Sequence, residues 1–305
     1  MIPYVEVYDL KIGPMKFSVF GLLLAIAVFG GAELARRRAR KRGEDVAALT
    51  SLAWWVVVVG FITAHLFDEI CYHPRQVVER PWSLLFVWEG ISSFGGFLGC
   101  ALGALAWKYY ELKPVAHIGS LAIRLPVRRA VPHPILAIGE NIAAVFPTAW
   151  IFGRLGCSIV HDHPGGRATS KSAFAVAFGP GTSTDYGFFA VHHGWSPRYD
   201  LGLLELMYTV LVVVLFALMS RRKLPAGTYS CASLLLYAPV RFGLDFLRAE
   251  DQDGGDPRYF WLTPGQWAAI AMFAGGLWLL SYIWSKRASE PLASTVSQSQ
   301  AASGA

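Results

Sequence analysis

Five ionisable side chains lie inside long apolar stretches of the sequence, where a charge needs an explanation. A charge in the hydrocarbon region of a membrane costs roughly 3 kcal/mol on insertion scales, so such residues are usually paired or functional. The five residues are Glu140, Arg154, Glu205, Arg241 and Asp245. Each is therefore a candidate for an ion pair or for a binding site.

Arg241 and Asp245 are four residues apart, and on a helix they share one side with Tyr237 and Arg248. One interpretation is a structural ion pair that ties helices together. The other is a cavity for an anionic headgroup, because the planar guanidinium fork of arginine binds phosphate through two hydrogen bonds. Arg154 and Arg241 are both expected near the outer ends of their helices, where they would clamp one phosphate between them.

A histidine-containing segment follows Arg154 and offers proton acceptors. His161, Asp162 and His163 immediately precede a Pro-Gly-Gly sequence. Because histidine titrates near neutral pH, either histidine is a candidate general base. The alternative interpretation is a polar turn without a chemical role.

The stretch from Ser92 to Gly99 has almost no side-chain bulk on one face, with Gly95 and Gly96 at its centre. Small residues of this kind allow two membrane helices to pack closely. The alternative is that a bound lipid approaches the backbone at the two glycines.

The elements that carry these residues are expected to be membrane-spanning helices. Of the 305 residues, 54% are hydrophobic and 16% are charged, and the mean hydropathy is +0.41; a soluble domain is usually about 25% charged. A helix needs about 20 mostly apolar residues to span a bilayer. About seven stretches fit this requirement and predict an all-α, polytopic membrane protein: residues 17–35, 49–67, 91–107, 135–152, 201–219, 229–246 and 266–284.

Basic residues cluster after the first, third, fifth and seventh of these stretches. Because short cytoplasmic loops collect Lys and Arg, the N-terminus is expected outside the cell and the C-terminus in the cytoplasm. We expect one transmembrane domain over residues 1–288, in which residues 154–200 form a small periplasmic head. Residues 289–305 are rich in Ser, Ala and Gln and are expected to form a disordered cytoplasmic tail.

The composition argues against several other classes of protein. The net charge is +6, but no basic stripe with interleaved aromatic residues is present, so no nucleic-acid partner is expected. The cysteines have no CxxC spacing, so neither a zinc or thiol-redox site nor a disulfide framework is expected. No metal and no cofactor is indicated. The four cysteines are Cys71, Cys100, Cys157 and Cys231.

Three segments of the chain resemble the prolipoprotein diacylglyceryl transferase family. Residues 152–157, Phe-Gly-Arg-Leu-Gly-Cys, are similar to its Gly-Arg-x-Gly-Asn signature. Residues 87–99, Val-Trp-Glu-Gly-Ile-Ser-Ser-Phe-Gly-Gly-Phe-Leu-Gly, are similar to its Trp-Asp/Glu-Gly…Ser-Phe-His-Gly-Gly-Leu stretch. Residues 241–248, followed by residues 262–267, resemble its Arg-Phe-x-x-Glu-x-x-Arg…Met-Gly-Gln stretch. The matches occur in order over roughly residues 17–284.

The resemblance implies a seven-helix protein of the bacterial inner membrane and a lipid-transfer reaction. The family moves diacylglyceryl from phosphatidylglycerol to the thiol of the lipobox cysteine in a prolipoprotein signal peptide, which gives a thioether and glycerol phosphate. The implied partners are therefore phosphatidylglycerol, prolipoprotein signal peptides and membrane lipids. Arg154 and Arg241 would serve the phosphate as catalytic residues, and Glu205 and Asp245 would hold these arginines. Further residues expected at the substrate are Tyr237, Gly95, Gly96, Cys157 and Arg248.

The sequence departs from the family pattern where a proton acceptor is expected. Phe94 stands in place of the family's histidine and cannot take a proton, and Cys157 replaces an asparagine. His161 or His163 would then take the catalytic role of the missing base. Two alternatives stay open. One is a diverged member that binds phospholipid without transferring it, and the other is a membrane transporter, although no internal repeat is visible.

Overall fold

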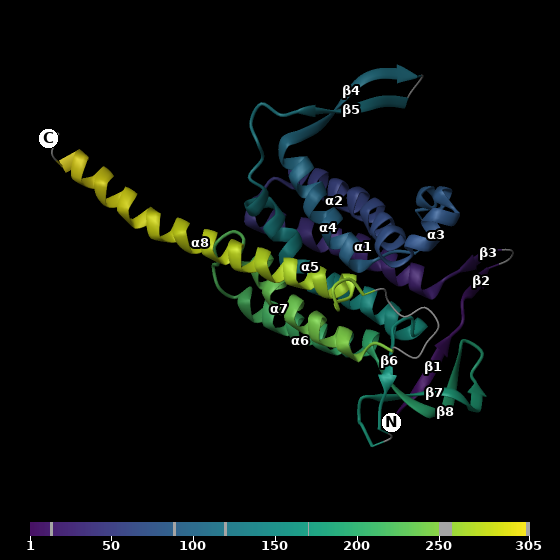
Figure 1. Cartoon of the computed structure of the whole chain (residues 1–305). Helices are drawn as coiled ribbons and strands as arrows, with labels where there is room; N and C mark the ends of the chain where they lie inside the picture. Colours follow the sequence, from purple (N-terminus) through teal and green to yellow (C-terminus); the bar gives the residue numbers. More distant parts are fainter. Residues whose placement is uncertain (13–14, 88–89, 119–120, 170, 250–257, 303–305) are drawn as a thin grey trace.

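The computed structural model describes residues 1–12, 15–87, 90–118, 121–169, 171–249 and 258–302, and most of them lie in helices that run alongside one another (Figure 1). Short helical segments connect the second and fourth helices: η1 (Asp68–Tyr72), α3 (Pro74–Glu79) and η2 (Pro81–Leu85). The long helices are α1 (Val19–Arg42), α2 (Val46–Phe67), α4 (Ser93–Tyr109), α5 (Ile135–Val160), α6 (Leu201–Met219), α7 (Thr228–Leu244), which η3 (Asp245–Leu247) extends, and α8 (Pro264–Ala302).

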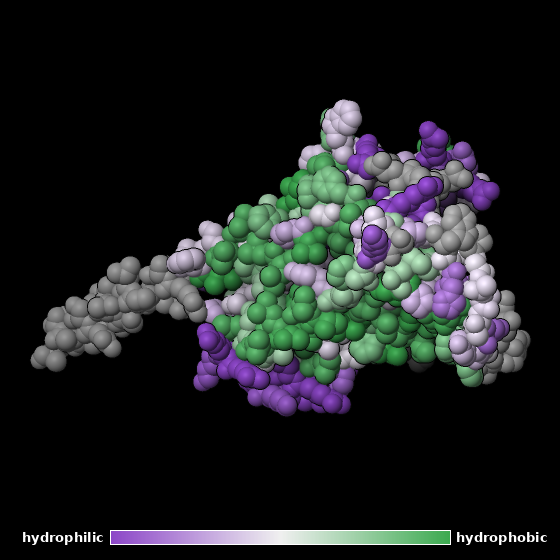
Figure 2. Space-filling view, turned by 90° about the horizontal axis from the view of Figure 1, so that it is seen from below, coloured by the Kyte–Doolittle hydropathy of each residue, from purple (hydrophilic) through white to green (hydrophobic). Residues whose placement is uncertain are grey.

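Six of the described helices are long and apolar enough to cross a membrane: α1, α2 with η1, α5, α6, α7 with η3, and α8 as far as Lys286. The predicted polytopic helical fold is therefore confirmed. Figure 2 shows the corresponding hydrophobic surface over the middle of the molecule, with hydrophilic residues gathered toward its edges.

The count of seven spans stays a prediction, because it depends on α4. This helix has 17 residues and is therefore about 25 Å long at 1.5 Å per residue, which is shorter than the roughly 30 Å of a hydrocarbon core. The expectation of a disordered tail after residue 288 also stays a prediction.

Helix α4 packs closely against α2 through a row of glycines. A Cβ atom at Gly95 would lie 2.7 Å from the carbonyl oxygen of Thr63, and one at Gly99 would lie 2.7 Å from the carbonyl oxygen of Val59. Such distances leave no room for any side chain. The close-packing interpretation of the glycine stretch therefore holds for Gly95, whereas Gly96 has more space, with Ala64 at 3.8 Å.

The head is built from strands, which the sequence did not predict. Four strands form one sheet in the order β1 (Ile2–Val7), β7 (Ala175–Asp185), β8 (Phe189–Asp200), β6 (Pro164–Arg167). The N-terminal strand β1 pairs antiparallel with β8 and parallel with β7, so the head contains the start of the chain (Figure 1). Residues 154–160, which we expect in the head from the sequence, instead complete helix α5.

Two further hairpins complete the described part of the chain. Strands β2 (Leu10–Ile12) and β3 (Met15–Phe17) connect the head to α1. Strands β4 (Tyr110–Ile118) and β5 (Leu121–Arg128) pair antiparallel and project away from the helices (Figure 1). The basic connection between α4 and α5 is therefore an ordered hairpin.

Glu140 has a structural explanation at the start of α7. Its carboxylate accepts hydrogen bonds from the backbone N–H groups of Tyr229 at 2.8 Å and Ser230 at 3.4 Å. A carboxylate at a helix N-terminus satisfies N–H groups that have no partner within the helix, and it interacts favourably with the helix dipole. Glu140 is thus a cap that joins α5 to α7.

Candidate active site

Arg154 lies buried among four helices near the end of α5, with 2% of its surface exposed. Its Nε lies 2.7 Å from Oε1 of Glu205 on α6, and its Nη2 donates to the hydroxyl of Tyr237 on α7 at 3.1 Å. The Tyr237 hydroxyl donates in turn to the same Glu205 oxygen at 2.6 Å. Beneath the guanidinium, the ring of Trp150 lies 4.7 Å from Cζ. Glu205 therefore provides the counter-charge of the buried Arg154.

Arg241 lies one helical turn beyond Tyr237 on α7 and forms the second ion pair. Its Nη2 is 3.1 Å from Oδ1 of Asp245, so the pair expected from their spacing is present. Nη1 of Arg248 lies 3.6 Å from the same oxygen, and the hydroxyl of Thr263 donates to the other oxygen of Asp245. The carboxylate of Asp245 is thereby fixed from three directions.

Thr263 is itself held by the start of α8. The Thr263 hydroxyl accepts from the backbone N–H of Gln266 at 3.1 Å, and the Gln266 side chain accepts from the backbone N–H of Thr263 at 3.1 Å. This reciprocal arrangement is a capping box. The Thr-Pro-Gly-Gln sequence is a recognisable capping signal, although it does not reveal the contact between Thr263 and Asp245.

The start of α4 contacts both arginines and so brings them to one place. The Ser93 hydroxyl accepts from Nη2 of Arg154 at 3.4 Å, and the ring of Phe94, the next residue, lies 5.4 Å from Cζ of Arg241. A histidine in the position of Phe94 would therefore contact Arg241 directly. Ser93 was not selected from the sequence, because nothing there distinguishes it from a helix-capping serine.

The ion pairs bring three guanidinium groups together around two buried carboxylates. Arg154 pairs with Glu205, and both Arg241 and Arg248 lie against Asp245. In addition, Nε of Arg241 is buried and has no hydrogen-bond partner among the described residues. This cluster of three guanidinium groups, which we call the arginine cluster, is electrostatically suited to one anion.

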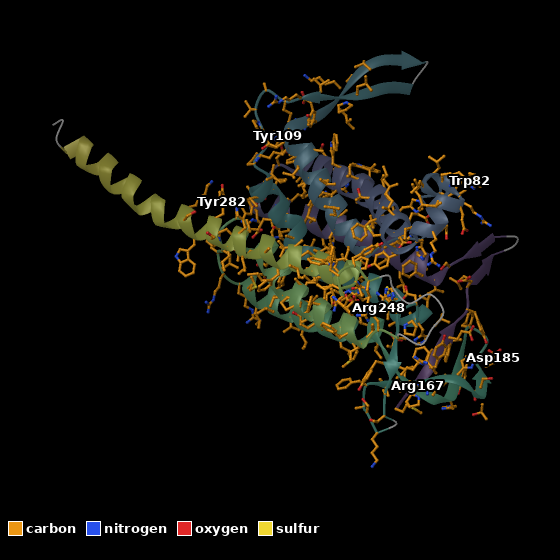
Figure 3. All side chains as sticks on the ribbon, viewed as in Figure 1. Trp82, Tyr109, Arg167, Asp185, Arg248 and Tyr282 are labelled. Atoms are coloured by element: carbon orange, nitrogen blue, oxygen red, sulfur yellow. The ribbon has the colours of Figure 1, made fainter. Side chains whose placement is uncertain are left out.

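Arg248 also ties the cluster to the head. Figure 3 places its side chain where the helices meet the strands. Arg248 forms a backbone bridge with Gly165 of β6, and a Cβ at Gly165 would lie 2.8 Å from the carbonyl oxygen of Leu247. The close approach of the two backbones therefore requires glycine at position 165.

His161 is engaged on both ring nitrogens. Its Nδ1 is paired with the carboxylate of Asp200, its Nε2 lies 3.1 Å from the carbonyl oxygen of Val5, and its ring stacks on Tyr4 at 3.9 Å between centroids. Asp200 is buried and also caps α6 through the N–H of Leu203 at 3.0 Å. These contacts join β1 to the helices and leave His161 poorly placed for the predicted catalytic role.

Asp162 and His163 lie closer to the arginine cluster. Burial, together with the positive charges of Arg154, Arg248 and Arg241, lowers the pKa of His163 to about 3. Burial likewise raises the pKa of Asp162 to about 6, although the charge of Arg154 opposes this rise. His163 is therefore neutral near pH 7, and it senses all three guanidinium groups.

Cys157 connects this segment to Arg154. It is buried, and its Sγ accepts from Nη1 of Arg154 at 3.7 Å. Its thiol also lies within hydrogen-bonding reach of the Asp162 carboxylate. The predicted site residues Arg154, Arg241, Tyr237 and Cys157 thus gather around one location. Trp88 and Glu89, which belong to the family-like stretch before α4, lie outside the described residues.

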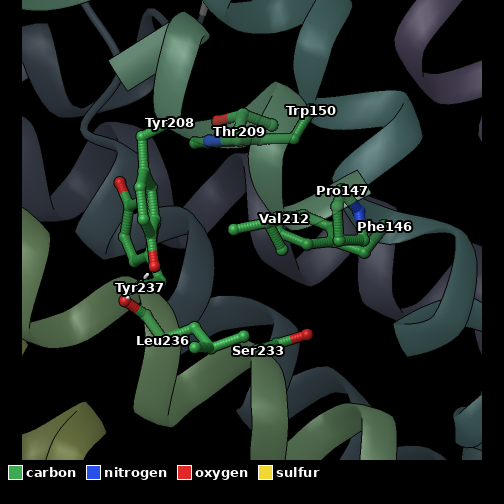
Figure 4. A pocket seen from close by; sticks show the side chains of 9 residues that line it. All are labelled: Phe146, Pro147, Trp150, Tyr208, Thr209, Val212, Ser233, Leu236 and Tyr237. Carbon is green, nitrogen blue, oxygen red and sulfur yellow. Dashed lines mark hydrogen bonds between the residues drawn. The ribbon is translucent and has the colours of Figure 1, made fainter. Parts of the chain in front are cut away.

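A small cavity adjoins Tyr237 on the side away from the head. Its volume is about 30 Å³, which is room for one or two water molecules, since one water needs roughly 10–15 Å³ of such space. It lies between α5, α6 and α7 (Figure 4) and is lined by Phe146, Pro147, Trp150, Tyr208, Thr209, Val212, Ser233, Leu236 and Tyr237. The lining is mostly apolar, and in this state the cavity is too small for an acyl chain.

Comparisons with known proteins match the sequence of this protein over nearly the whole chain. The family model for prolipoprotein diacylglyceryl transferase matches residues 8–282. A phosphatidylglycerol–prolipoprotein diacylglyceryl transferase of Nitratidesulfovibrio vulgaris (strain Miyazaki F) is 30% identical over 91% of this chain and 94% of its own length. A similarly named protein of Chromohalobacter salexigens is 28% identical over 93% of this chain and 94% of its own length. One of Pseudomonas fluorescens is 25% identical over 97% of this chain and 100% of its own length. This multi-span membrane protein therefore belongs to the prolipoprotein diacylglyceryl transferase family.

Proposed function

We propose that this protein transfers diacylglyceryl from phosphatidylglycerol to the lipobox cysteine of prolipoproteins. The names of its relatives support the two substrates. The observation that carries the proposal is the arginine cluster, because a phosphodiester needs a preorganised positive site in a place that also contacts lipid. The products are a thioether-linked lipoprotein and glycerol phosphate.

The arginine cluster suits the phosphodiester of phosphatidylglycerol, which is an anion. Arg154 and Arg241 are held by Glu205 and Asp245, so their guanidinium groups are fixed near one place. The unpartnered Nε of Arg241 supplies one available donor. Because these donors are fixed by buried ion pairs, little reorganisation is needed when charge develops on the leaving phosphate.

The chemical step is a displacement at the glyceryl carbon that bears the phosphate. The sulfur of the acceptor cysteine attacks this carbon, the C–S bond forms as the C–O bond breaks, and the electron pair goes to the phosphate oxygen. Arg154 and Arg241 stabilise that oxygen. The thiol must lose its proton, since the thiolate is the nucleophile. Phe94 cannot accept it, and the described polar groups Asp162 and His163 both lie within electrostatic range of Arg154 on the side of the head.

We further propose that the protein lies in the bacterial inner membrane, with its N-terminus and head outside and its C-terminus in the cytoplasm. The alternation of basic loops supports this orientation. It puts the arginine cluster just below the outer surface, where phospholipid headgroups and the cleavage region of a signal peptide meet. Acyl chains would then extend along the apolar helices.

The test is transfer by the purified protein in nanodiscs that contain labelled phosphatidylglycerol, with a lipobox peptide as acceptor. We expect a thioether product from the wild type and none from Arg154→Ala. Arg221→Ala is the matched control, because Arg221 is exposed after α6, remote from the cluster, and this variant should keep full activity.

A second candidate function is phospholipid binding without transfer, and the observation that favours it is Phe94 in the place of the family's base. It predicts that native mass spectrometry detects bound phosphatidylglycerol while the transfer assay gives no product. Transfer by the wild-type protein would exclude this alternative.

A further inference from the structure

Three potential metal ligands of different types lie close together at the end of α5. One ligand atom each from Cys157, Asp162 and His163 lie within 4.8 Å of one another. We propose that these residues bind one Zn²⁺ ion and that its open fourth position takes the acceptor thiol. This inference rests on the proposed function only for the identity of that fourth ligand.

The local backbone explains why the three side chains meet. Helix α5 ends at His161, which adopts a left-handed conformation with φ of 50° and so turns the chain back over the last helical turn, where Cys157 lies. The backbone carbonyl of His163 accepts from the N–H of Leu201 at 3.1 Å, which fixes the returning segment against α6. The contacts of His161 with Asp200 and Val5 hold the turn from the other side.

The ligand set is the kind that zinc prefers in catalytic sites. Zinc binds sulfur, nitrogen and carboxylate oxygen tetrahedrally, and catalytic zinc sites use three protein ligands and leave one position open. Calcium and magnesium favour oxygen ligands alone. Tetrahedral zinc needs ligand atoms about 3.3–3.8 Å apart, so the side chains must close by up to about 1.5 Å, which rotation about their χ angles allows.

Hydrogen bonds prepare two of the ligands. Nδ1 of His163 lies 3.0 Å from the carbonyl oxygen of Asp162; when Nδ1 carries the proton, the lone pair of Nε2 is left for the metal. Orientation of a zinc-binding histidine through its other nitrogen is common. The guanidinium of Arg154 donates to the Cys157 sulfur and so orients this side chain.

Charge balance permits a dication beside the arginine cluster. The Cys157 thiolate and the Asp162 carboxylate together cancel the charge of Zn²⁺, so the filled site is neutral. The neighbouring guanidinium groups would repel an uncompensated cation, but they attract the thiolate of the acceptor and the phosphate of the lipid. The acceptor thiolate and the lipid phosphate are therefore both attracted to this place.

Zinc would supply the step for which Phe94 is unsuitable. A thiol that coordinates a metal is deprotonated, and its proton leaves to water as it binds. The zinc-bound sulfur then attacks the glyceryl carbon, the C–S bond forms, the C–O bond breaks, and the phosphate leaves to Arg154 and Arg241. The resulting thioether is neutral and binds zinc more weakly than a thiolate, so the product dissociates.

A second group of possible ligands must be removed from the experiment. Asp68, Glu69 and His73 also lie close together, but they contain no sulfur. We therefore use full-length protein with His73→Ala, which is purified through a tag without histidines and reconstituted in nanodiscs. After removal of metal, the protein is titrated with Zn²⁺, or with Co²⁺ as a spectroscopic substitute. We expect one equivalent to bind and cobalt to show a near-ultraviolet thiolate charge-transfer band.

Matched variants show whether Cys157 is the thiolate that gives the charge-transfer band. Cys157→Ser should remove it and weaken zinc binding at least about 100-fold, and Asp162→Asn and His163→Gln, which keep the thiol, should weaken binding as well. Cys71→Ser should change nothing. Bound phosphatidylglycerol, measured by native mass spectrometry, reports that each variant is folded. Absence of stoichiometric binding, or the same band in Cys157→Ser, would overturn the metal site.

The acceptor peptide tests the role of the fourth position. A lipobox peptide with its cysteine should add a second thiolate band to the cobalt spectrum, and the same peptide with serine should not. An unchanged spectrum would overturn thiol activation. Metal binding without any transfer would contradict the proposed function and leave the metal site intact, so the two failures are distinguishable.

Discussion

Replacement of Glu205 by glutamine removes the negative charge of this side chain and keeps its shape. The amide would keep an oxygen that accepts from the Tyr237 hydroxyl, now at 2.6 Å, but it would leave Arg154 without a counter-charge. Both side chains of the ion pair are almost fully buried, with 3% and 2% of their surface exposed. We therefore expect E205Q to be less stable and to respond more strongly to an anionic ligand.

The magnitude follows from the burial of the pair. Removing one partner of a buried ion pair costs about 3–5 kcal/mol, and the hydrogen bonds that the glutamine can keep reduce this to about 2–3 kcal/mol. At about 2–4 °C per kcal/mol for a chain of this size, the apparent Tm should fall by roughly 5–10 °C. Phosphatidylglycerol should then stabilise E205Q by about 1.5–3 kcal/mol more than the wild type, because its phosphate replaces the lost carboxylate.

The assay is thermal unfolding in nanodiscs of a zwitterionic lipid, with and without phosphatidylglycerol. Glu33→Gln is the control, since Glu33 is only half-buried and pairs with the exposed Arg37, and such an ion pair contributes about 0–1 kcal/mol. A Tm loss in E205Q no larger than in E33Q would refute the reasoning. Equal stabilisation of E205Q and wild type by phosphatidylglycerol would refute it too.

Four further predictions follow from the same contacts. Arg154→Lys keeps a charge but loses the fork that reaches Glu205 and Tyr237, so transfer should fall about 10²–10³-fold in the peptide assay; near-normal rates would contradict this. Phe94→His puts a base beside Arg241 and should raise transfer in the Cys157→Ser variant, whereas no gain would argue against a role for position 94. His161→Ala should speed hydrogen exchange in β1 while phosphatidylglycerol binding persists; unchanged exchange would show that the contacts of His161 are not needed. Glu140→Gln should lower Tm by roughly 2–4 °C through the start of α7, with transfer unaffected, and a loss of transfer would assign Glu140 to the site.

Much of the helical framework could be predicted because the bilayer constrains it locally. A run of apolar residues identifies a spanning helix without knowledge of its neighbours, and the spacing of Arg241 and Asp245 identified their ion pair. The partner of Arg154 is different. Glu205 lies on another helix, and the family resemblance, not the spacing, suggested that it holds an arginine.

The head could not be predicted because its pairings are distant in sequence. Strand β1 hydrogen-bonds to β8, which begins at residue 189, and the contact of His161 with Val5 spans 156 residues. Nothing local distinguishes His161, which joins these segments, from His163, which faces the arginine cluster. The same holds for Glu140, whose role as a cap depends on where α7 begins.

The proximity of the three proposed zinc ligands is also hard to predict from the sequence. The sequence lacks CxxC, but Cys157 meets Asp162 and His163 because the chain reverses at His161, and that left-handed turn has no strong signal in a residue that is not glycine. A glycine at the end of α5 would have suggested the reversal.

The most direct test of the central claim is the distance between the arginine cluster and the lipid phosphate. Solid-state NMR on nanodiscs with ¹⁵N-labelled arginine can measure dipolar coupling to the ³¹P nucleus of phosphatidylglycerol, with Arg154→Lys and Arg241→Lys assigning the signals. The account predicts coupling at hydrogen-bonding distance for both guanidinium groups in the wild type. Coupling that is absent, or that persists unchanged in both variants, would contradict it.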